Sequence, residues 1–203
     1  MGHREELLVA ARRLLETKGY ARITARDLVA ESGTNLASIG YHFGSKEGLL
    51  NAAIGAVFDE WTEQVAAIAM ADPNAAPLER ARATWTALLT SLPKRRALLL
   101  SYVEAMAQAE RTPALRQQFA EHYRGVRARV AQLVVQSLGG ALGPDDPRAA
   151  AIASWVIAIC DGLALQWLLD PESTPTPADL NAGHALMWQE SLRLLLAAPT
   201  ADQ

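Results

Sequence analysis

Residues 24–46 read TARDLVAESGTNLASIGYHFGSK, and this stretch decides the fold. Thr24 and Asp27 have the spacing of a capping box, which predicts that a short helix begins directly after Thr24. Gly33 predicts a tight turn, and Asn35 is placed to cap a second short helix. Two helices this short cannot each bury an apolar stripe alone, so we expect them to share a core with their neighbours.

The sequence on both sides of this stretch predicts further helices. Residues 4–18 place Leu and Ala on one face before a stop at Gly19, and Ser45 is placed to cap a longer helix. The expected common core comprises Leu7, Ala11, Leu14, Leu28, Val29, Ile39, Phe43 and Leu50.

Longer helices are predicted in the remainder of the chain, at residues 77–91, 94–108, 113–138, 147–169 and 178–197. Three of them begin with proline after a capping residue, at Thr112, Asp146 and Thr176. No segment has the alternating pattern of a strand over a useful length. We therefore predict an all-α fold of about nine helices, with a three-helix helix-turn-helix domain at residues 1–50 and a helical domain at residues 51–203.

The composition excludes several classes of protein. Half of the 203 residues are hydrophobic, which is enough to bury a core and too many for a disordered chain. Cys160 is the one cysteine, which excludes an intrachain disulfide framework and a cysteine-rich zinc module. The histidines show no metal-binding spacing, and there is no glycine-rich phosphate loop or nucleophile elbow. We expect no metal, no cofactor and no catalytic residues, so an enzyme is disfavoured.

The net charge of −3 argues, as an average, against a nucleic-acid partner. The charge is unevenly distributed, however. Residues 1–50 hold seven Lys and Arg against six Asp and Glu, whereas residues 51–203 hold twelve against sixteen. The acidity therefore belongs to the C-terminal part, and the N-terminal part stays compatible with a nucleic acid.

The second short helix has an outer face that the shared core does not need. This face is small and weakly charged, as in a helix that lies in a DNA major groove, and comprises Leu36, Ala37, Ser38, Gly40 and Tyr41. Side chains of phosphate-binding types stand around it, namely Thr24, Arg26, Tyr41, His42 and Lys46. The helices that follow Thr24 and Ser45 also offer N-terminal N–H groups to phosphates.

The block Tyr41-His42-Phe43-Gly44-Ser45-Lys46-Glu47, with Ile23-Thr24 and Arg26-Asp27-Leu28 upstream, resembles the DNA-binding domain of the TetR-type transcriptional regulators. The resemblance covers residues 4–50. It implies a ligand-responsive repressor that binds a palindromic double-stranded DNA operator as a homodimer and a small-molecule effector through its C-terminal domain. Residue by residue, it implies base-facing positions at Arg26, Leu36, Ala37, Ser38 and Gly40, and backbone contacts at Thr24, Tyr41, His42 and Lys46.

Two positions depart from the family pattern. Gly40 stands where the family often has a larger residue, commonly Tyr, so a contact is missing and the helix is less stable by about 0.5–1 kcal/mol. Leu36 stands where polar residues are common, which suits a thymine methyl group better than a hydrogen-bonding base edge. Gly40 is also the best support for the alternative function, a helical small-molecule-binding or scaffolding protein without DNA-binding activity.

The large side chains of the C-terminal part allow two interpretations. They either fill gaps between alanine-rich helices or line an apolar cavity for the effector. The candidate cavity residues are Trp61, Trp85, Tyr102, Met106, Phe119, Tyr123 and Cys160. Glu104 and Asp161 lie in apolar helical settings, where either carboxylate pairs with a cationic effector or with an arginine.

The last two predicted helices are more apolar than the surface of a monomer needs. A two-fold four-helix interface made by two copies of this pair accounts for the excess. Its candidate residues are Ile152, Trp155, Val156, Ile159, Leu163, Trp167, Trp188, Leu192 and Leu195.

Residues 149–169 are long and apolar enough to require a comparison with a membrane span. Asp161 and Gln166 interrupt the stretch, and one central Asp disfavours insertion by about 2.5–3.5 kcal/mol. We therefore favour a helix buried in an assembly and expect no membrane partner. The N-terminus carries no apolar signal core, so we expect a cytoplasmic protein.

Overall fold

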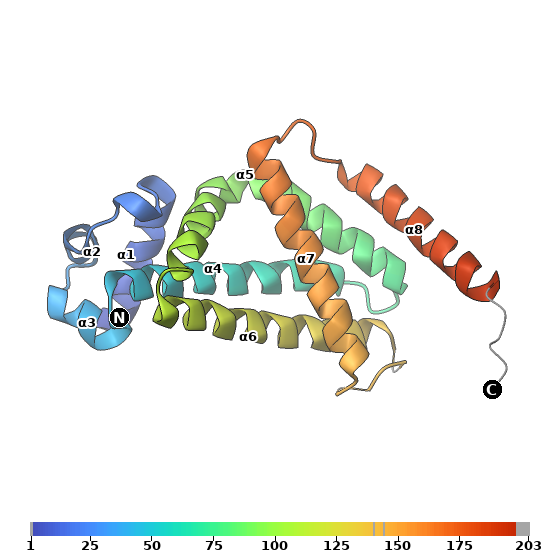
Figure 1. Cartoon of the computed structure of the whole chain (residues 1–203), viewed down its shortest axis with the longest axis horizontal. Helices are drawn as coiled ribbons and strands as arrows, with labels where there is room; N and C mark the ends of the chain where they lie inside the picture. The colour runs from blue at the N-terminus through green and yellow to red at the C-terminus, as the bar shows by residue number, and fades with distance from the viewer. Residues whose placement is uncertain (1, 140, 144, 198–203) are drawn as a thin grey trace.

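The computed structural model describes residues 2–139, 141–143 and 145–197, without the side chains of residue 188 and of residues 190–197. Over these residues the chain forms eight α-helices and one short 3₁₀ helix, and no strand. The elements are α1 (His3–Thr17), η1 (Tyr20–Arg22), α2 (Ala25–Ser32), α3 (Leu36–Phe43), α4 (Lys46–Ala69), α5 (Pro77–Ala109), α6 (Pro113–Ser137), α7 (Pro147–Leu169) and α8 (Pro177–Ala197). Figure 1 shows α1–α3 at one end of an elongated body made by α4–α7, with α8 beside α5 at the other end. The predicted all-α fold class is confirmed.

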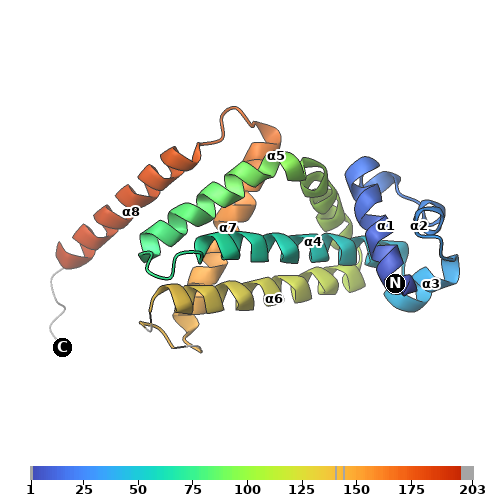
Figure 2. The same cartoon turned by 180° about the vertical axis from the view of Figure 1, so that it is seen from behind.

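α5 is a single helix where the sequence predicts two. Pro93 lies inside it and lacks the backbone N–H that would close a helical hydrogen bond. Leu92 and Leu98 are buried on either side of the proline, so packing supports the helix across the break. The ribbon of α5 changes direction part-way along in Figures 1 and 2, as a proline inside a helix causes. The described residues therefore hold eight α-helices instead of nine, and α5 has two differently directed halves.

The predicted caps of the two short helices are confirmed. The Thr24 hydroxyl accepts the N–H of Asp27 (3.2 Å), and the Asp27 carboxylate accepts the N–H of Thr24 (2.7 Å), which completes the capping box. Gly33 ends α2 with a φ of +67°, a left-handed conformation that favours glycine. The Asn35 side chain accepts the N–H of Ser38 (3.0 Å) at the start of α3. Local hydrogen bonds thus fix both ends of the turn.

The expected N-terminal core is confirmed, and it reaches further along the chain than the sequence indicates. All eight predicted residues belong to one cluster that also holds side chains from α5 and α6, namely Leu98, Ala105, Ala109, Leu115 and Phe119. The second half of α5 is therefore part of the core on which α1–α3 rest. The domain boundary predicted at residue 50 falls inside α4 and stays a prediction.

A second apolar cluster holds the C-terminal helices together. Trp61 of α4, Trp85 of α5 and Leu163 of α7 lie in it, and Leu180 at the start of α8 packs against it. Among the described residues, α7 is the one helix long and apolar enough to cross a membrane by length and composition. A helix in a protein core or interface has the same composition, so this is weak support for a membrane span.

Candidate nucleic-acid interface and ligand cavity

α3 presents an open face to solvent. Leu36 and Tyr41 are 55% and 86% exposed, and Ala37 and Gly40 are exposed beside them. A Cβ added at Gly40 meets no other atom within 4 Å, so the backbone is open to a partner there. Arg26 is also exposed, in the first turn of α2. Four of the five predicted base-facing residues are therefore accessible.

Ser38 is the fifth of these residues, and it lies on the inner side of α3, only 8% exposed. Its hydroxyl bonds the Asn35 side chain (3.3 Å) and lies 3.2 Å from Nδ1 of His3 on α1. The Asn35 cap and the burial of Ile39 set the rotation of α3 about its axis, and this rotation turns Ser38 toward α1. In the free chain Ser38 therefore holds α3 in place.

The predicted backbone-contacting residues surround the open face. Thr24 is exposed at the start of α2, and Tyr41 projects from the end of α3. His42 is half-buried, with its ring edge-on to that of Tyr41 and 4.8 Å between the ring centroids. Thr24 and Ser45 also cap the N-termini of α2 and α4, whose free N–H groups are suited to phosphate oxygens.

Lys46 differs from the other backbone-contacting residues because it already has partners. Its Nζ donates to the backbone carbonyl of Ile23 (2.9 Å) and lies 3.2 Å from the Glu47 carboxylate. These contacts tie the start of α4 to the segment before α2. An ammonium group has three N–H donors, so Lys46 retains one for a phosphate oxygen.

An ion pair fixes the start of α2 against the end of α1. Nζ of Lys18 donates to Oδ2 of Asp27 (2.6 Å), in addition to the bonds that Asp27 accepts from Thr24. The Lys18 ammonium, followed by the Thr24 donors, holds the pKa of Asp27 well below its usual range. The charged carboxylate therefore orients the helix turn that carries Arg26.

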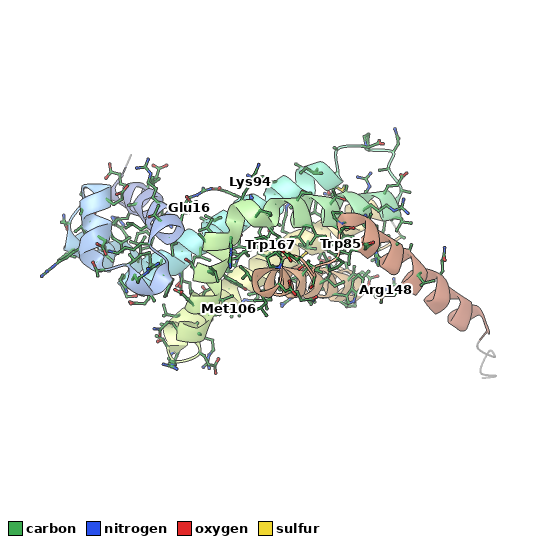
Figure 3. The ribbon with its side chains drawn as sticks, turned by 90° about the horizontal axis from the view of Figure 1, so that it is seen from above. Glu16, Trp85, Lys94, Met106, Arg148 and Trp167 are labelled. Carbon is green, nitrogen blue, oxygen red and sulfur yellow. The ribbon has the colours of Figure 1, made fainter. Side chains whose placement is uncertain are left out.

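A cavity of about 1200 Å³ lies among α4, α5, α6 and α7 and reaches α8. Phe119 does not line it, because its ring packs against that of Tyr102 (5.9 Å between centroids) in the N-terminal core. Figure 3 shows Met106 toward the α1–α3 end of the body and Trp85 toward α8, so the cavity extends along much of the body. The other six predicted cavity residues do line it, namely Trp61, Trp85, Tyr102, Met106, Tyr123 and Cys160.

One face of α6 forms a further part of the cavity wall. It carries Val126, Val130, Leu133 and Val134 at helical spacing. The same spacing is typical of a helix packed in a core, so nothing in the sequence separates these wall residues from core residues. Phe58 of α4 lines the cavity as well, although the sequence does not single it out.

Three polar side chains of the cavity wall, Tyr102, Tyr123 and Asp161, are hydrogen-bonded to one another. The hydroxyl of Tyr123 donates to Oδ2 of Asp161 (2.7 Å), and the hydroxyls of Tyr102 and Tyr123 bond one another. Burial raises the pKa of Asp161 and raises that of Tyr102 to about 12. Burial, followed by the nearby Asp161 carboxylate, raises the pKa of the Cys160 thiol to about 12. Cys160 therefore stays neutral, in keeping with a small apolar wall residue.

Glu104 belongs to a different environment from Asp161. Its carboxylate accepts the N–H of Ala21 in η1 (2.9 Å) and does not line the cavity. Ser101, three positions earlier in α5, donates to the carbonyl of Leu15 in α1 (3.3 Å). The second half of α5 thus supports α1 and η1 through hydrogen bonds as well as through the shared core.

Two family models match the chain. Residues 7–53 match the model described as bacterial regulatory proteins, tetR family, and residues 77–186 match the model described as BetI-type transcriptional repressor, C-terminal. The chain belongs to the TetR family. The resemblance in the sequence is confirmed, and the chain is a DNA-binding transcriptional regulator of this family. TetR-family regulators are generally transcription factors without enzymatic activity.

Solved structures of TetR-type proteins share this fold. The multidrug-binding protein EbrR in complex with imidazole is 27% identical, with 99% of this chain and 98% of that chain covered and a TM-score of 0.62. EbrR in complex with proflavin is 29% identical, with 85% and 92% covered and a TM-score of 0.59. A TetR transcription regulator from Haloarcula marismortui, 20% identical with 92% and 95% covered and a TM-score of 0.62, shows the fold alone. A comparison with curated proteins gives no match.

The predicted dimer-interface residues of this TetR-family chain differ in how much surface they offer. Ile152 and Trp155 are 36% and 40% exposed. Leu163 is only 5% exposed because it packs with Trp61 and Trp85 of the same chain, so it has no surface for a second copy. Three further residues are half-buried, namely Val156, Ile159 and Trp167. The remaining three have side chains outside the described part of the structure, namely Trp188, Leu192 and Leu195.

Proposed function

We propose that this chain is a homodimeric repressor that binds a palindromic operator and releases it when a small molecule occupies the cavity. The observation that carries the proposal is the double role of α5. Tyr102 and Met106 line the cavity, whereas Ser101 and Glu104 on the same turns bond α1 and η1. A ligand that displaces Tyr102 therefore acts on the support of the DNA-binding helices.

α4 supplies a second connection between the two sites. It begins at Lys46, beside α3 and bonded to Ile23 just before α2, and carries Phe58 and Trp61 in the cavity wall. In a dimer, a small tilt of α4 in each subunit changes the distance between the two α3 helices, which must match successive major grooves. A ligand that prefers the wider-spaced state by about 1–3 kcal/mol is enough to weaken operator binding. By linkage, the operator then lowers the affinity for the ligand by the same factor by which the ligand lowers the affinity for the operator.

The exposure of the α3 face supports the division of DNA contacts that the family resemblance implies. Bases are contacted by Arg26, Leu36, Ala37 and Gly40, and the phosphate backbone by Thr24, Tyr41, His42 and Lys46. We assign Ser38 to holding α3 against α1, because its hydroxyl is committed to His3 and Asn35.

The dimer forms through α7 and α8. Exposed apolar side chains on these helices support this interface, namely Ile152, Trp155, Leu165, Leu169, Leu186 and Met187. A stable interface of this kind buries at least about 1,200 Å² in total. Its formation accounts for the apolar composition of α7 without a membrane. A protein that binds operator DNA is expected in the cytoplasm, where that DNA lies.

The effector is a small organic molecule that enters the cavity. EbrR, which shares the fold and 27–29% of the sequence, forms complexes with proflavin and with imidazole. A cavity with aromatic and aliphatic walls and few polar groups is suited to ligands of this size.

Selection of bound fragments from random duplex DNA tests the proposal. We expect the full chain to enrich a palindrome, and a ligand that perturbs tryptophan fluorescence to lower its affinity for that palindrome. Sedimentation should show a dimer at micromolar concentration, which Trp155→Arg shifts toward monomer. A chain that binds ligand but enriches no DNA sequence would support the alternative, a binding protein without DNA-binding activity.

A further inference from the structure

Asp161 is the one carboxylate in the described part of the cavity wall. Its Oδ2 accepts the hydroxyl of Tyr123 (2.7 Å), and no donor in the described residues reaches its other oxygen, Oδ1. A carboxylate in an apolar wall is unfavourable while part of its hydrogen-bonding capacity is unused. The cavity therefore contains a carboxylate oxygen to which a ligand is able to donate a hydrogen bond.

The positive charges of the described wall do not neutralise this carboxylate. Arg80 donates to backbone carbonyls within residues 69–75, at the far end of α4. Phe58, which packs against Tyr102, precedes Ala69 by about 16 Å along the helix axis. The Arg80 charge is thus committed to another part of the cavity.

The two histidines of the wall do not supply a counter-charge either. Nδ1 of His122 lies 3.5 Å from the carboxylate of Asp59, so this ring has its own acidic neighbour. Burial lowers the pKa of His184, which favours its neutral form. None of these three basic side chains is therefore placed to compensate a negative charge on Asp161.

Aromatic rings surround the same part of the cavity. Phe58 contacts both Tyr102 (4.8 Å between ring centroids) and Trp61 (5.7 Å), and Tyr123 adjoins Tyr102 through its hydroxyl. Aromatic faces attract cations as well as apolar groups. A carboxylate among such rings is suited to a positive charge on an apolar body.

We propose that the cavity binds a monovalent organic cation, whose charge pairs with Asp161 and whose apolar body lies against Phe58, Trp61 and Tyr102. This proposal rests on the proposed function, because it names the chemical class of the effector for the same cavity. A single positive charge matches the single carboxylate, whereas a neutral or anionic ligand leaves that carboxylate unpaired.

Two ions of nearly the same size and shape test the charge preference. Tetraphenylphosphonium carries one positive charge and tetraphenylborate one negative charge, and both are titrated against the full chain by calorimetry and tryptophan fluorescence. We expect tetraphenylphosphonium to bind at least tenfold more tightly. Equal affinity for the two ions, or no binding of the cation up to millimolar concentration, overturns the proposal.

Asp161→Asn tests the residue, since it removes the charge but keeps the size and an acceptor for Tyr123. We expect a loss of tenfold or more in tetraphenylphosphonium affinity and no loss for tetraphenylborate. The control Glu172→Gln removes one exposed charge from the same half of the chain and should change neither affinity. Thermal unfolding of both variants shows that they are folded, and an unchanged cation affinity in folded Asp161→Asn excludes the assigned role.

A DNA readout separates this proposal from the proposed function. With a palindromic fragment selected as above, tetraphenylphosphonium should lower DNA affinity in the wild type and much less in Asp161→Asn. Release of DNA by tetraphenylborate instead means that the charge class is wrong and the regulator proposal stands. Failure to bind any DNA in the absence of ligand contradicts the proposed function and leaves the cation measurements as an independent result on the cavity.

Discussion

The two ends of the molecule are packed in different ways. In the N-terminal region, side-chain caps close α2 and α3, and Leu7, Leu15 and Leu28 are fully buried. α6 is 25 residues long, yet its buried residues among those described are Leu115 and Phe119, which belong to the N-terminal core. Much of the remaining helix faces a cavity. A surface that must match DNA needs a fixed shape, whereas a ligand site needs unfilled space.

Truncating one leucine in each region should give the largest difference in stability loss between the two regions. Leu28→Ala leaves a hole in a closed core and should lower the free energy of unfolding by about 2–5 kcal/mol. Leu133→Ala enlarges a cavity that already exists and should lower it by less than about 1.5 kcal/mol. Urea unfolding monitored by circular dichroism measures both, and equal losses would contradict the difference in packing.

DNA binding should separate two residues within the N-terminal region. Lys46→Ala removes one proposed phosphate contact, so it should weaken binding to all sequences alike and reduce the slope of log affinity against log salt by about one. Leu36→Gln should instead change the preferred bases, because Leu36 is exposed on the α3 face. Fragment selection and salt titrations distinguish the two effects. A change of base preference in Lys46→Ala, with none in Leu36→Gln, would reverse our assignment.

Helix caps offer a matched pair of threonines. Thr24 accepts the N–H of Asp27 at the start of α2, whereas the Thr112 side chain makes no cap bond at the start of α6. Thr24→Ala should lower the free energy of unfolding by about 1 kcal/mol, and Thr112→Ala by less than about 0.5 kcal/mol. Thermal or urea unfolding tests the pair, and a larger loss for Thr112→Ala would argue against the observed capping.

The contributions of one aspartate in each region to the free energy of unfolding should depend on pH with opposite sign. Asp27 has a lowered pKa, so its stabilising effect is present above the ordinary carboxyl value of about 3.9 and is lost as the pH falls below it. Asp161 has a raised pKa. Its contribution to stability is therefore present below the ordinary carboxyl value and is lost as the pH rises through the raised pKa. At pH 7, Asp27→Asn should be less stable than the wild type and Asp161→Asn more stable.

Urea unfolding from pH 7 down to pH 3 checks both variants of this pair. The differences from the wild type should shrink as the pH falls. For Asp27 the unfolded state becomes protonated while the folded state stays charged, and for Asp161 the folded state becomes protonated. Tyr102 and Tyr123 do not titrate in this range, since burial raises the pKa of each. A stability change of the same sign in the two variants would contradict the opposite pKa shifts.

Sequence reasoning succeeds in the N-terminal region because its structure is determined locally. The capping box at Thr24, the left-handed Gly33 and the Asn35 cap are each visible within a few residues, and each forms as predicted. The rotation of α3 is different. An eight-residue helix has about two turns, and the position of Ser38 depends on contacts with Asn35 and His3 that periodicity does not contain.

The C-terminal region is less predictable because its helices are held by distant contacts. Pro93 predicts a helix boundary by local rules, but buried leucines on both sides keep α5 continuous. The spacing of Val126 and Val130 on α6 indicates an apolar face and not whether that face meets a neighbour or a cavity. Asp161 is visible as an acidic residue in an apolar helix, and only the structure shows Tyr123 as its partner.

The contact between α5 and α1 has a consequence for building hybrid regulators. The hydrogen bonds from Ser101 and to Glu104 involve backbone atoms of α1 and η1, which any DNA-binding domain of the same shape supplies. The side chains of Ala105 and Ala109 are a stricter condition, because both are buried in the core shared with α1. A domain grafted in place of residues 1–50 must fit against these two alanines, so transplanting DNA specificity into this chain means transferring or redesigning this stretch of α5 together with α3.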